Sequence, residues 1–205
     1  MATIQQSLKE IEILQEKIFE KEFEDEFQSR LTNITTVIYF DHLSHAVLHG
    51  ARKIDLSTVD GAKKYYELYS KQYLLQECIR INFVGHFFNI WMEYERFLRR
   101  KSKFFFGEEK FKISTVFDRI LDLVEDTEKG KFKNEFDVIR LTRNSLHDGG
   151  IYRHGKPFKG KIGNQTYIFV PYQPVIPIRN LDVVKTIWEH FLIIDKIDIT
   201  SKSSS

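Results

Sequence analysis

The sequence predicts a mainly all-α fold, a bundle of about five to seven helices with a small β-hairpin inserted near residues 156–178. Apolar residues recur at helical spacing along most of the 205 residues, and 42% of the residues are hydrophobic. Residues 156–178 break this pattern, because apolar and polar residues alternate there and prolines interrupt them. We expect one domain over residues 1–199 and a disordered polar tail over residues 200–205.

Helical periodicity is clear in the first half of the chain. Residues 4–30 carry isoleucine and leucine three and four positions apart, which predicts an amphipathic helix. A second helical pattern covers residues 33–49, and Gly50 is a suitable end for it. After a connection at residues 52–61, the longest pattern covers residues 62–101. Its second half is apolar on most sides, which is typical of the central helix of a bundle.

The sequence of the second half of the chain predicts shorter helices and a hairpin. Helical patterns cover residues 114–125, 134–147 and 181–196. Gly163-Asn164 is a good two-residue hairpin turn, and residues 160–162 and 166–170 on either side have strand-like composition. A two-stranded hairpin does not hold a stable core alone, so we expect it to pack on the bundle.

The composition excludes several classes of protein. A net charge of +2 excludes a uniformly basic molecule, so contact with nucleic acid needs a local patch. A single cysteine excludes an internal disulfide and argues against a cysteine-built metal site. The first residues do not resemble a secretion signal, and no apolar run approaches the roughly 20 residues that span a bilayer. We therefore expect a cytoplasmic protein that does not enter a membrane.

One group of residues has the composition of a catalytic or phosphate-binding site. On a helix over residues 134–147, Arg140, Arg143, Asn144 and His147 fall within one sector, because a helix turns once in about 3.6 residues. Arg143 and Asn144 lie within one turn of His147. Arg140 lies two turns away, about 10 Å along the axis, which its long side chain shortens.

These residue types suit the cleavage of RNA without a metal. A histidine can give or take a proton near neutral pH, and an arginine can hold a phosphate by two parallel hydrogen bonds. A base that removes the 2′-hydroxyl proton, a cation beside the phosphoryl oxygens and an acid at the leaving oxygen complete the reaction. A structural interpretation is also open, since basic residues in a last helical turn stabilise the helix end before a glycine.

The segment Arg140-Leu-Thr-Arg143-Asn144-Ser-Leu-His147 resembles the motif of HEPN domains. In that family four to six residues separate an arginine, often followed by a polar residue, from a histidine near the end of a helix. Arg143 is followed by Asn144, but only three residues separate Arg143 from His147. Six residues separate Arg140 from His147, but Leu141 follows it. Either arginine therefore remains a candidate for the family's role.

The resemblance implies a HEPN-like helical bundle, a homodimer and a metal-independent endoribonuclease of a bacterial or archaeal defence or toxin system. His147 is then the general acid or base, Arg143 or Arg140 holds the scissile phosphate, and Asn144 orients the site. RNA is the implied partner, together with an antitoxin or another defence protein. Because some HEPN domains are inactive, the alternative is a non-catalytic module that binds RNA, a nucleotide or a partner protein.

Three further residues are candidates for binding the substrate: Glu93, Arg153 and Lys156. Glu93 belongs to a polar stripe on the 62–101 helix. This stripe either faces solvent or faces the motif, where Glu93 or Glu95 would pair with an arginine. Arg153 and Lys156 begin a basic stretch interleaved with aromatic residues. Such a stretch either holds a phosphate backbone and unpaired bases or is an ordinary solvated hairpin.

No cofactor or metal is expected. The sequence has no glycine-rich phosphate loop, no G-x-S-x-G elbow and no H-E-x-x-H motif, which argues against an NTPase, an α/β-hydrolase and a zinc protease. His42, His45 and His49 share a helical face and form an alternative zinc site. Asp41 is the one carboxylate beside them that would complete it.

Overall fold

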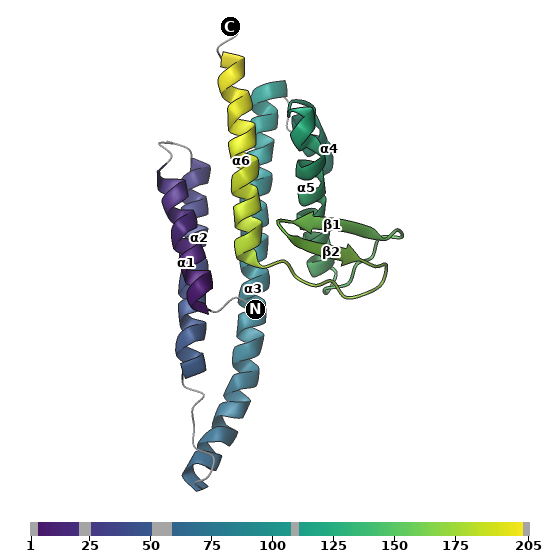
Figure 1. The fold of residues 1–205 in the computed structure, drawn as a ribbon. Helices are drawn as coiled ribbons and strands as arrows, with labels where there is room; N and C mark the ends of the chain where they lie inside the picture. Colours follow the sequence, from purple (N-terminus) through teal and green to yellow (C-terminus); the bar gives the residue numbers. More distant parts are fainter. Residues whose placement is uncertain (1–3, 21–25, 51–58, 108–110, 203–205) are drawn as a thin grey trace. The chain divides into compact units, whose positions relative to one another are not determined.

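The computed structural model describes residues 4–20, 26–50, 59–107 and 111–202. Within these ranges the chain forms six helices and one two-stranded antiparallel hairpin (Figure 1). The predicted mainly helical fold with a small hairpin is therefore confirmed. The chain gathers into two compact units, residues 1–87 and 88–205. The boundary between them falls inside the longest helix.

Unit 1, residues 1–87, contains α1 (Ile4–Phe19), α2 (Glu26–Gly50) and the first part of α3 (Val59–Phe106). The sequence pattern predicted a single helix over residues 4–30, but α1 ends at Phe19 and α2 begins at Glu26. The sequence between these ends is acidic. Carboxylates disfavour the C-terminal end of a helix and favour an N-terminal end, which explains why one helix stops and another starts here.

Helices α1 and α2 pack antiparallel. Tyr39, late in α2, donates a hydrogen bond to Glu12 of α1 at 3.2 Å, and the Gln15 amide donates to Thr36 at 3.0 Å. The buried apolar residues of the two helices lie three, four or seven positions apart, as an amphipathic pair requires. They are Ile11, Leu14 and Ile18 on α1 and Phe27, Leu31 and Ile38 on α2.

Unit 2, residues 88–205, holds the rest of α3, α4 (Ile113–Asp122), α5 (Asp126–His147), β1 (Phe158–Ile162), β2 (Gln165–Phe169) and α6 (Asn180–Lys202). Helix α5 begins at Asp126 rather than at Asn134. Asp126 and Glu128 lie in its first turn, where the helix dipole favours carboxylates. Helix α6 continues to Lys202, so residues 200–202 of the expected tail are helical.

An aromatic core joins the helices of unit 2. Phe117 of α4 stacks on Phe136 of α5, with ring centroids 3.7 Å apart and planes at 7°. Phe97 of α3 contacts Phe191 of α6 at a centroid distance of 5.4 Å. All four rings are buried, and such pairs contribute about 0.5–1.5 kcal/mol each beyond the burial of their area. Of the helices in the described ranges, none combines the length and hydropathy needed to cross a membrane.

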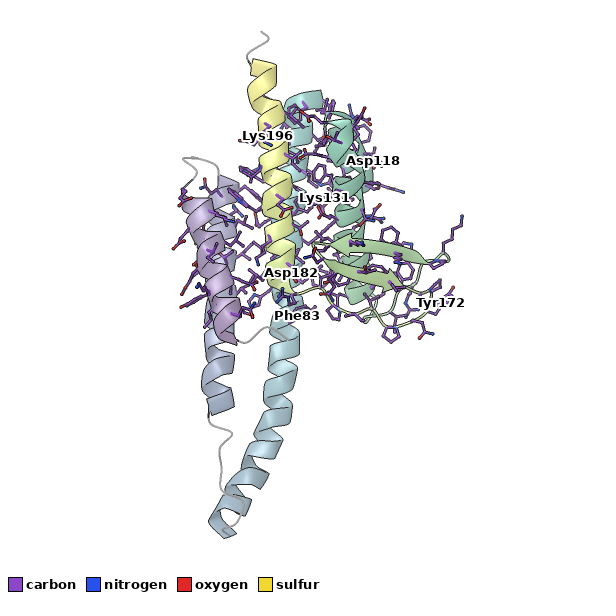
Figure 2. All side chains as sticks on the ribbon, viewed as in Figure 1. Phe83, Asp118, Lys131, Tyr172, Asp182 and Lys196 are labelled. Atoms are coloured by element: carbon purple, nitrogen blue, oxygen red, sulfur yellow. The ribbon has the colours of Figure 1, made fainter. Side chains whose placement is uncertain are left out.

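The hairpin packs on α5 and turns at Gly163-Asn164, as predicted. Gly160 is buried against α5, and a Cβ at this position would lie 2.3 Å from Cγ2 of Val138. The backbone N–H of Lys161 donates to Oδ1 of Asn134 at 2.7 Å. The missing side chain at Gly160 thus lets β1 lie close enough to the helix for this hydrogen bond. In Figure 1 the hairpin turn points toward α6, and Figure 2 shows Tyr172 beyond the far end of β2.

Candidate functional site

The four residues of the predicted motif lie at the C-terminal end of α5. His147 is the last residue of the helix, and its side chain is 69% exposed. Arg143 and Asn144 are half-buried one turn earlier, and Arg140 is half-buried a further turn back. The structure therefore brings an exposed imidazole, an arginine and an amide together at one helix end.

The two arginines of the motif have different partners. Arg140 donates from Nε and Nη2 to Oδ1 of Asp137, at 3.2 and 2.9 Å. Arg143 donates from Nη1 to Oδ1 of Asn144 at 3.2 Å, and its guanidinium carbon lies 5.8 Å from the centre of the Phe88 ring. Among the described residues, a carboxylate balances the charge of Arg140 but none balances that of Arg143. Arg143 is thus the arginine with charge available for a phosphate.

Two glycines end α5 directly after the motif. Gly149 and Gly150 have φ angles of 73° and 85°, a conformation that favours glycine. The N–H of Gly150 donates to the carbonyl of Ser145 at 2.7 Å, which closes the last turn. Nδ1 of His147 lies 3.7 Å from Oδ1 of Asp148. Because the chain turns away at this point, the imidazole remains at the surface.

Glu93 and Glu95 both bind arginines of their own helix, α3. Glu93 accepts a hydrogen bond from Arg96 at 2.8 Å, and Glu95 accepts one from Arg99 at 2.7 Å. Each motif arginine instead bonds to a residue of α5. That Glu93 or Glu95 orients a motif arginine therefore stays a prediction.

Arg153 and Lys156 follow the motif and are exposed. Two aromatic residues, Tyr152 and Phe158, were expected to accompany them, and Phe158 is half-buried. Tyr152 is only 3% exposed, and its hydroxyl donates a hydrogen bond to the carbonyl of Lys156 at 2.9 Å. Tyr152 therefore holds the segment rather than offering a ring to a ligand. The exposed tyrosine of this region is Tyr172, at 70%.

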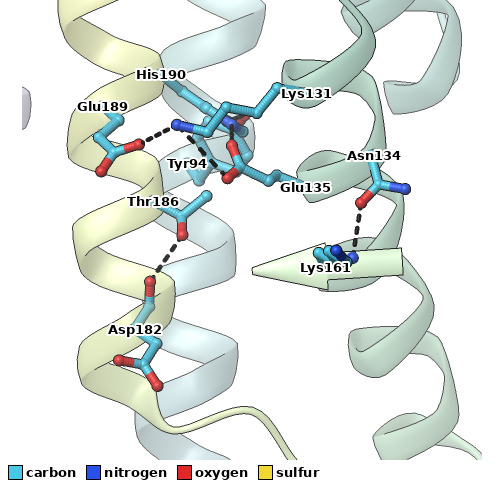
Figure 3. Close-up of polar contacts among 9 residues, drawn as sticks. All are labelled: Tyr94, Lys131, Asn134, Glu135, Lys161, Asp182, Thr186, Glu189 and His190. Atoms are coloured by element: carbon cyan, nitrogen blue, oxygen red, sulfur yellow. Dashed lines mark hydrogen bonds and ion pairs between the residues drawn. The ribbon is translucent and has the colours of Figure 1, made fainter. Parts of the chain in front are cut away.

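A buried polar network that the sequence did not predict connects α3, α5 and α6 (Figure 3). Oη of Tyr94 lies 2.5 Å from Nδ1 of His190, and Nε2 of His190 lies 3.1 Å from Oε2 of Glu135. Nζ of Lys131 lies 3.8 Å from Oε1 of Glu135 and 2.7 Å from Oε2 of Glu189. Tyr94, His190 and Glu135, one from each of the three helices, thus contact one another inside the aromatic core.

Burial sets the protonation of this network. It raises the pKa of Glu135 to about 7, although Lys131 opposes the shift. Burial also lowers the pKa of His190 well below 6.5 and raises the pKa of Tyr94 well above 10. At neutral pH the ring of His190 and the hydroxyl of Tyr94 are therefore uncharged. A neutral imidazole has one donor and one acceptor nitrogen. When Glu135 is ionised, Nε2–H therefore donates to Glu135 and Tyr94 donates to Nδ1.

Glu135 and Lys131 also line a groove of about 580 Å³ that α5, α6 and the hairpin turn enclose. Opposite charges in this groove are paired: Lys131 with Glu189 at 2.7 Å, and Arg179 with Asp182 at 2.7 Å. The sequence signal for this region was weak, because a single glutamate on the apolar face of α5 does not indicate which residue of another helix will pair with it.

Within the ranges that the structure describes, no three His, Cys, Asp or Glu side chains are grouped to hold a metal ion. The side chains of His42, His45 and His49, the alternative zinc site, lie outside the described residues. No family model, no curated protein and no solved structure matches this chain.

Proposed function

We propose that this protein is a metal-independent endoribonuclease of a defence or toxin system, with a HEPN-like fold and its site at the C-terminal end of α5. The observation that carries the proposal is the exposed His147 one turn from Arg143, whose charge no described carboxylate balances. An exposed imidazole can reach a substrate atom, and an unbalanced guanidinium attracts a phosphate.

Each residue of the motif has its own role in the proposed reaction. Arg143 holds the non-bridging oxygens of the scissile phosphate, and Asn144 fixes the guanidinium through the hydrogen bond from Nη1. His147 takes the proton of the ribose 2′-hydroxyl, whose oxygen attacks phosphorus, or gives a proton to the departing 5′-oxygen. The products are a 2′,3′-cyclic phosphate and a 5′-hydroxyl. A homodimer with two motif helices at one cleft supplies both a base and an acid.

The test is the incubation of the purified protein with a pool of single-stranded and structured RNA in excess EDTA, beside His147→Ala. We expect the wild type to cut and to leave cyclic phosphate ends, and the variant to leave the RNA intact. His154→Ala is a matched control, because His154 is also exposed and lies seven residues further on. Cutting by His147→Ala, or no cutting by a folded wild type, would contradict the proposal and favour a binding module.

A further inference from the structure

The segment after the motif is strongly basic. Residues 149–181 contain five basic residues and no carboxylate side chain, in a chain whose net charge is only +2. Four of the five are exposed and form no ion pair with any described residue: Arg153, Lys156, Lys159 and Lys161. This excess of positive charge, next to a proposed phosphate-cleaving site, favours a polyanion as the occupant.

The outer face of the hairpin combines these cations with apolar surface. Lys159 pairs across the strands with Ile168, and Lys161 pairs with Thr166. All four side chains are exposed, and Ile168 reaches 62%. The lysines are about two strand positions apart, roughly 7 Å, close to the spacing of successive phosphates in a single strand.

Tyr172 has a backbone conformation that its side chain does not favour. The N–H of Gln173 donates to the carbonyl of Val170 at 3.1 Å, which makes Pro171 and Tyr172 the central residues of a β-turn. Tyr172 has φ = 61°, and the third position of such a turn usually takes glycine for this reason. A bulky residue with positive φ is strained, and strain of this kind gathers at functional sites.

Packing of the Tyr172 side chain does not explain its strained backbone conformation. Its side chain is 70% exposed, and its ring contacts no other aromatic ring among the described residues. Its backbone is anchored near the motif, since the N–H of Tyr172 donates at 2.7 Å to the carbonyl of Tyr152, five residues after His147. The strained turn therefore presents an exposed aromatic ring on the segment that follows the catalytic helix.

We propose that this surface, called here the basic face and made of Arg153, Lys156, Lys159, Lys161, Ile168 and Tyr172, binds single-stranded RNA beside His147. The cations hold the phosphate backbone, and one unpaired base stacks on the ring of Tyr172. The inference rests on the proposed function in taking RNA as the substrate, and it adds the strand state of that RNA and the residues that bind it.

The first test measures the charge contribution. Binding of a fluorescent single-stranded RNA is followed by anisotropy at several salt concentrations, with the full chain carrying His147→Ala so that the RNA stays intact. Lys159→Gln with Lys161→Gln should lower the slope of log affinity against log salt by about 1.4, from roughly 0.7 per phosphate contact. The matched control is Lys9→Gln with Lys17→Gln, two exposed lysines of α1, which should leave the slope unchanged.

The second test separates binding from folding. Tyr172→Gly places glycine where the turn favours it, so the thermal midpoint should not fall. The affinity for RNA should nevertheless fall roughly 5- to 100-fold, because the stacking ring is lost. Tyr172→Phe keeps the ring and should bind RNA as tightly as the parent.

The outcomes distinguish this inference from the proposed function. It is overturned if the His147→Ala parent does not bind the RNA, or if Tyr172→Gly and the double lysine variant bind as tightly as their controls. Tighter binding to vesicles rich in phosphatidylserine than to RNA would also overturn it. RNA binding through the basic face by a protein that never cuts RNA would leave the inference standing while the ribonuclease proposal fails.

Discussion

The hydroxyl of Tyr94 on α3 lies 2.5 Å from Nδ1 of His190 on α6, and neither side chain reaches solvent. The other ring nitrogen of His190 forms a hydrogen bond with Glu135 on α5. Every polar atom of the imidazole is therefore satisfied inside an aromatic core, which keeps the cost of burying it low. These hydrogen bonds connect α3, α5 and α6, and α5 is the helix that ends in the motif.

Replacing Tyr94 by phenylalanine tests this relationship. The variant keeps the ring but leaves Nδ1 of His190 buried without a hydrogen-bond partner, so the free energy of unfolding should fall by about 1–3 kcal/mol. Denaturant unfolding followed by circular dichroism measures the change. Tyr172→Phe removes a hydroxyl from an exposed tyrosine and should change stability very little. Equal stability of the wild type and Tyr94→Phe would show that the hydrogen bond contributes nothing.

The pH dependence of stability should reveal Glu135. Its folded pKa, about 7, lies above its usual value of 4.5, so the folded state holds a proton that the unfolded state has released. The stability that the raised pKa of Glu135 contributes is therefore fully present below pH 4.5 and is lost as the pH rises through 7. The lowered pKa of His190 acts in the opposite direction, and its contribution is lost as the pH falls below 6.5.

Glu135→Gln removes the pH dependence of stability that comes from Glu135. Between about pH 5 and pH 8 the variant should gain about 2 kcal/mol of stability relative to the wild type, since one pKa unit corresponds to about 1.4 kcal/mol. Unfolding curves at a series of pH values give the difference. Glu16→Gln, at an exposed position of α1, should show no such trend. A constant difference across this range would mean that Glu135 titrates as an ordinary carboxyl.

Periodicity predicted the helices of unit 2 but not the contacts among them. Phe132, Phe136 and Ile139 recur at helical spacing, and all three are buried as this spacing implies. Glu135 lies three residues after Phe132 and four before Ile139, so the spacing places it on the same face, but a glutamate is not expected to be buried there without a partner. It is buried because His190, far away in the sequence, supplies a partner, and the pattern of a single helix does not contain that information. The boundary between the two compact units lies inside α3, so no break in the helical pattern marks it.

The position of the candidate site was predictable, whereas the roles of its arginines were not resolved. The motif lies at a helix end closed by two glycines, as the sequence indicated. The choice between Arg140 and Arg143 depends on Asp137, which lies three residues before Arg140 and pairs with it. That spacing is visible in the sequence, because residues three apart on a helix are neighbours.

Gly160→Ala should separate the hairpin from α5. The new methyl group would lie 2.3 Å from Cγ2 of Val138, so the strand must shift, and we expect a loss of about 1–3 kcal/mol. Gly155→Ala is the control, because a Cβ there meets no atom within 4 Å and the change should be nearly neutral. Thermal unfolding of the two variants gives the comparison. A Gly160→Ala protein as stable as Gly155→Ala would contradict the close packing of β1 on α5.

Arg143 and Arg140 should differ in catalysis if the proposed function holds. Arg143→Ala removes the cation available for the scissile phosphate, so the single-turnover rate of RNA cleavage should fall by about 10²- to 10³-fold. Arg140→Ala removes a cation already paired with Asp137 and should lower the rate by less than about 10-fold. Thermal midpoints of both variants check that they are folded. The reverse order of effects would assign the phosphate to Arg140.

A mixing experiment tests whether two chains share each site. His147→Ala and Arg143→Ala are each expected to be inactive as homodimers. If the histidine of one chain works with the arginine of the other, a heterodimer contains one site with both residues intact. Random exchange of the two variants should then restore about a quarter of the wild-type activity, because half the dimers are mixed and half of their sites are complete. If both residues act within one chain, every site in the mixture keeps one defect, and the activity stays at the level of the separate variants.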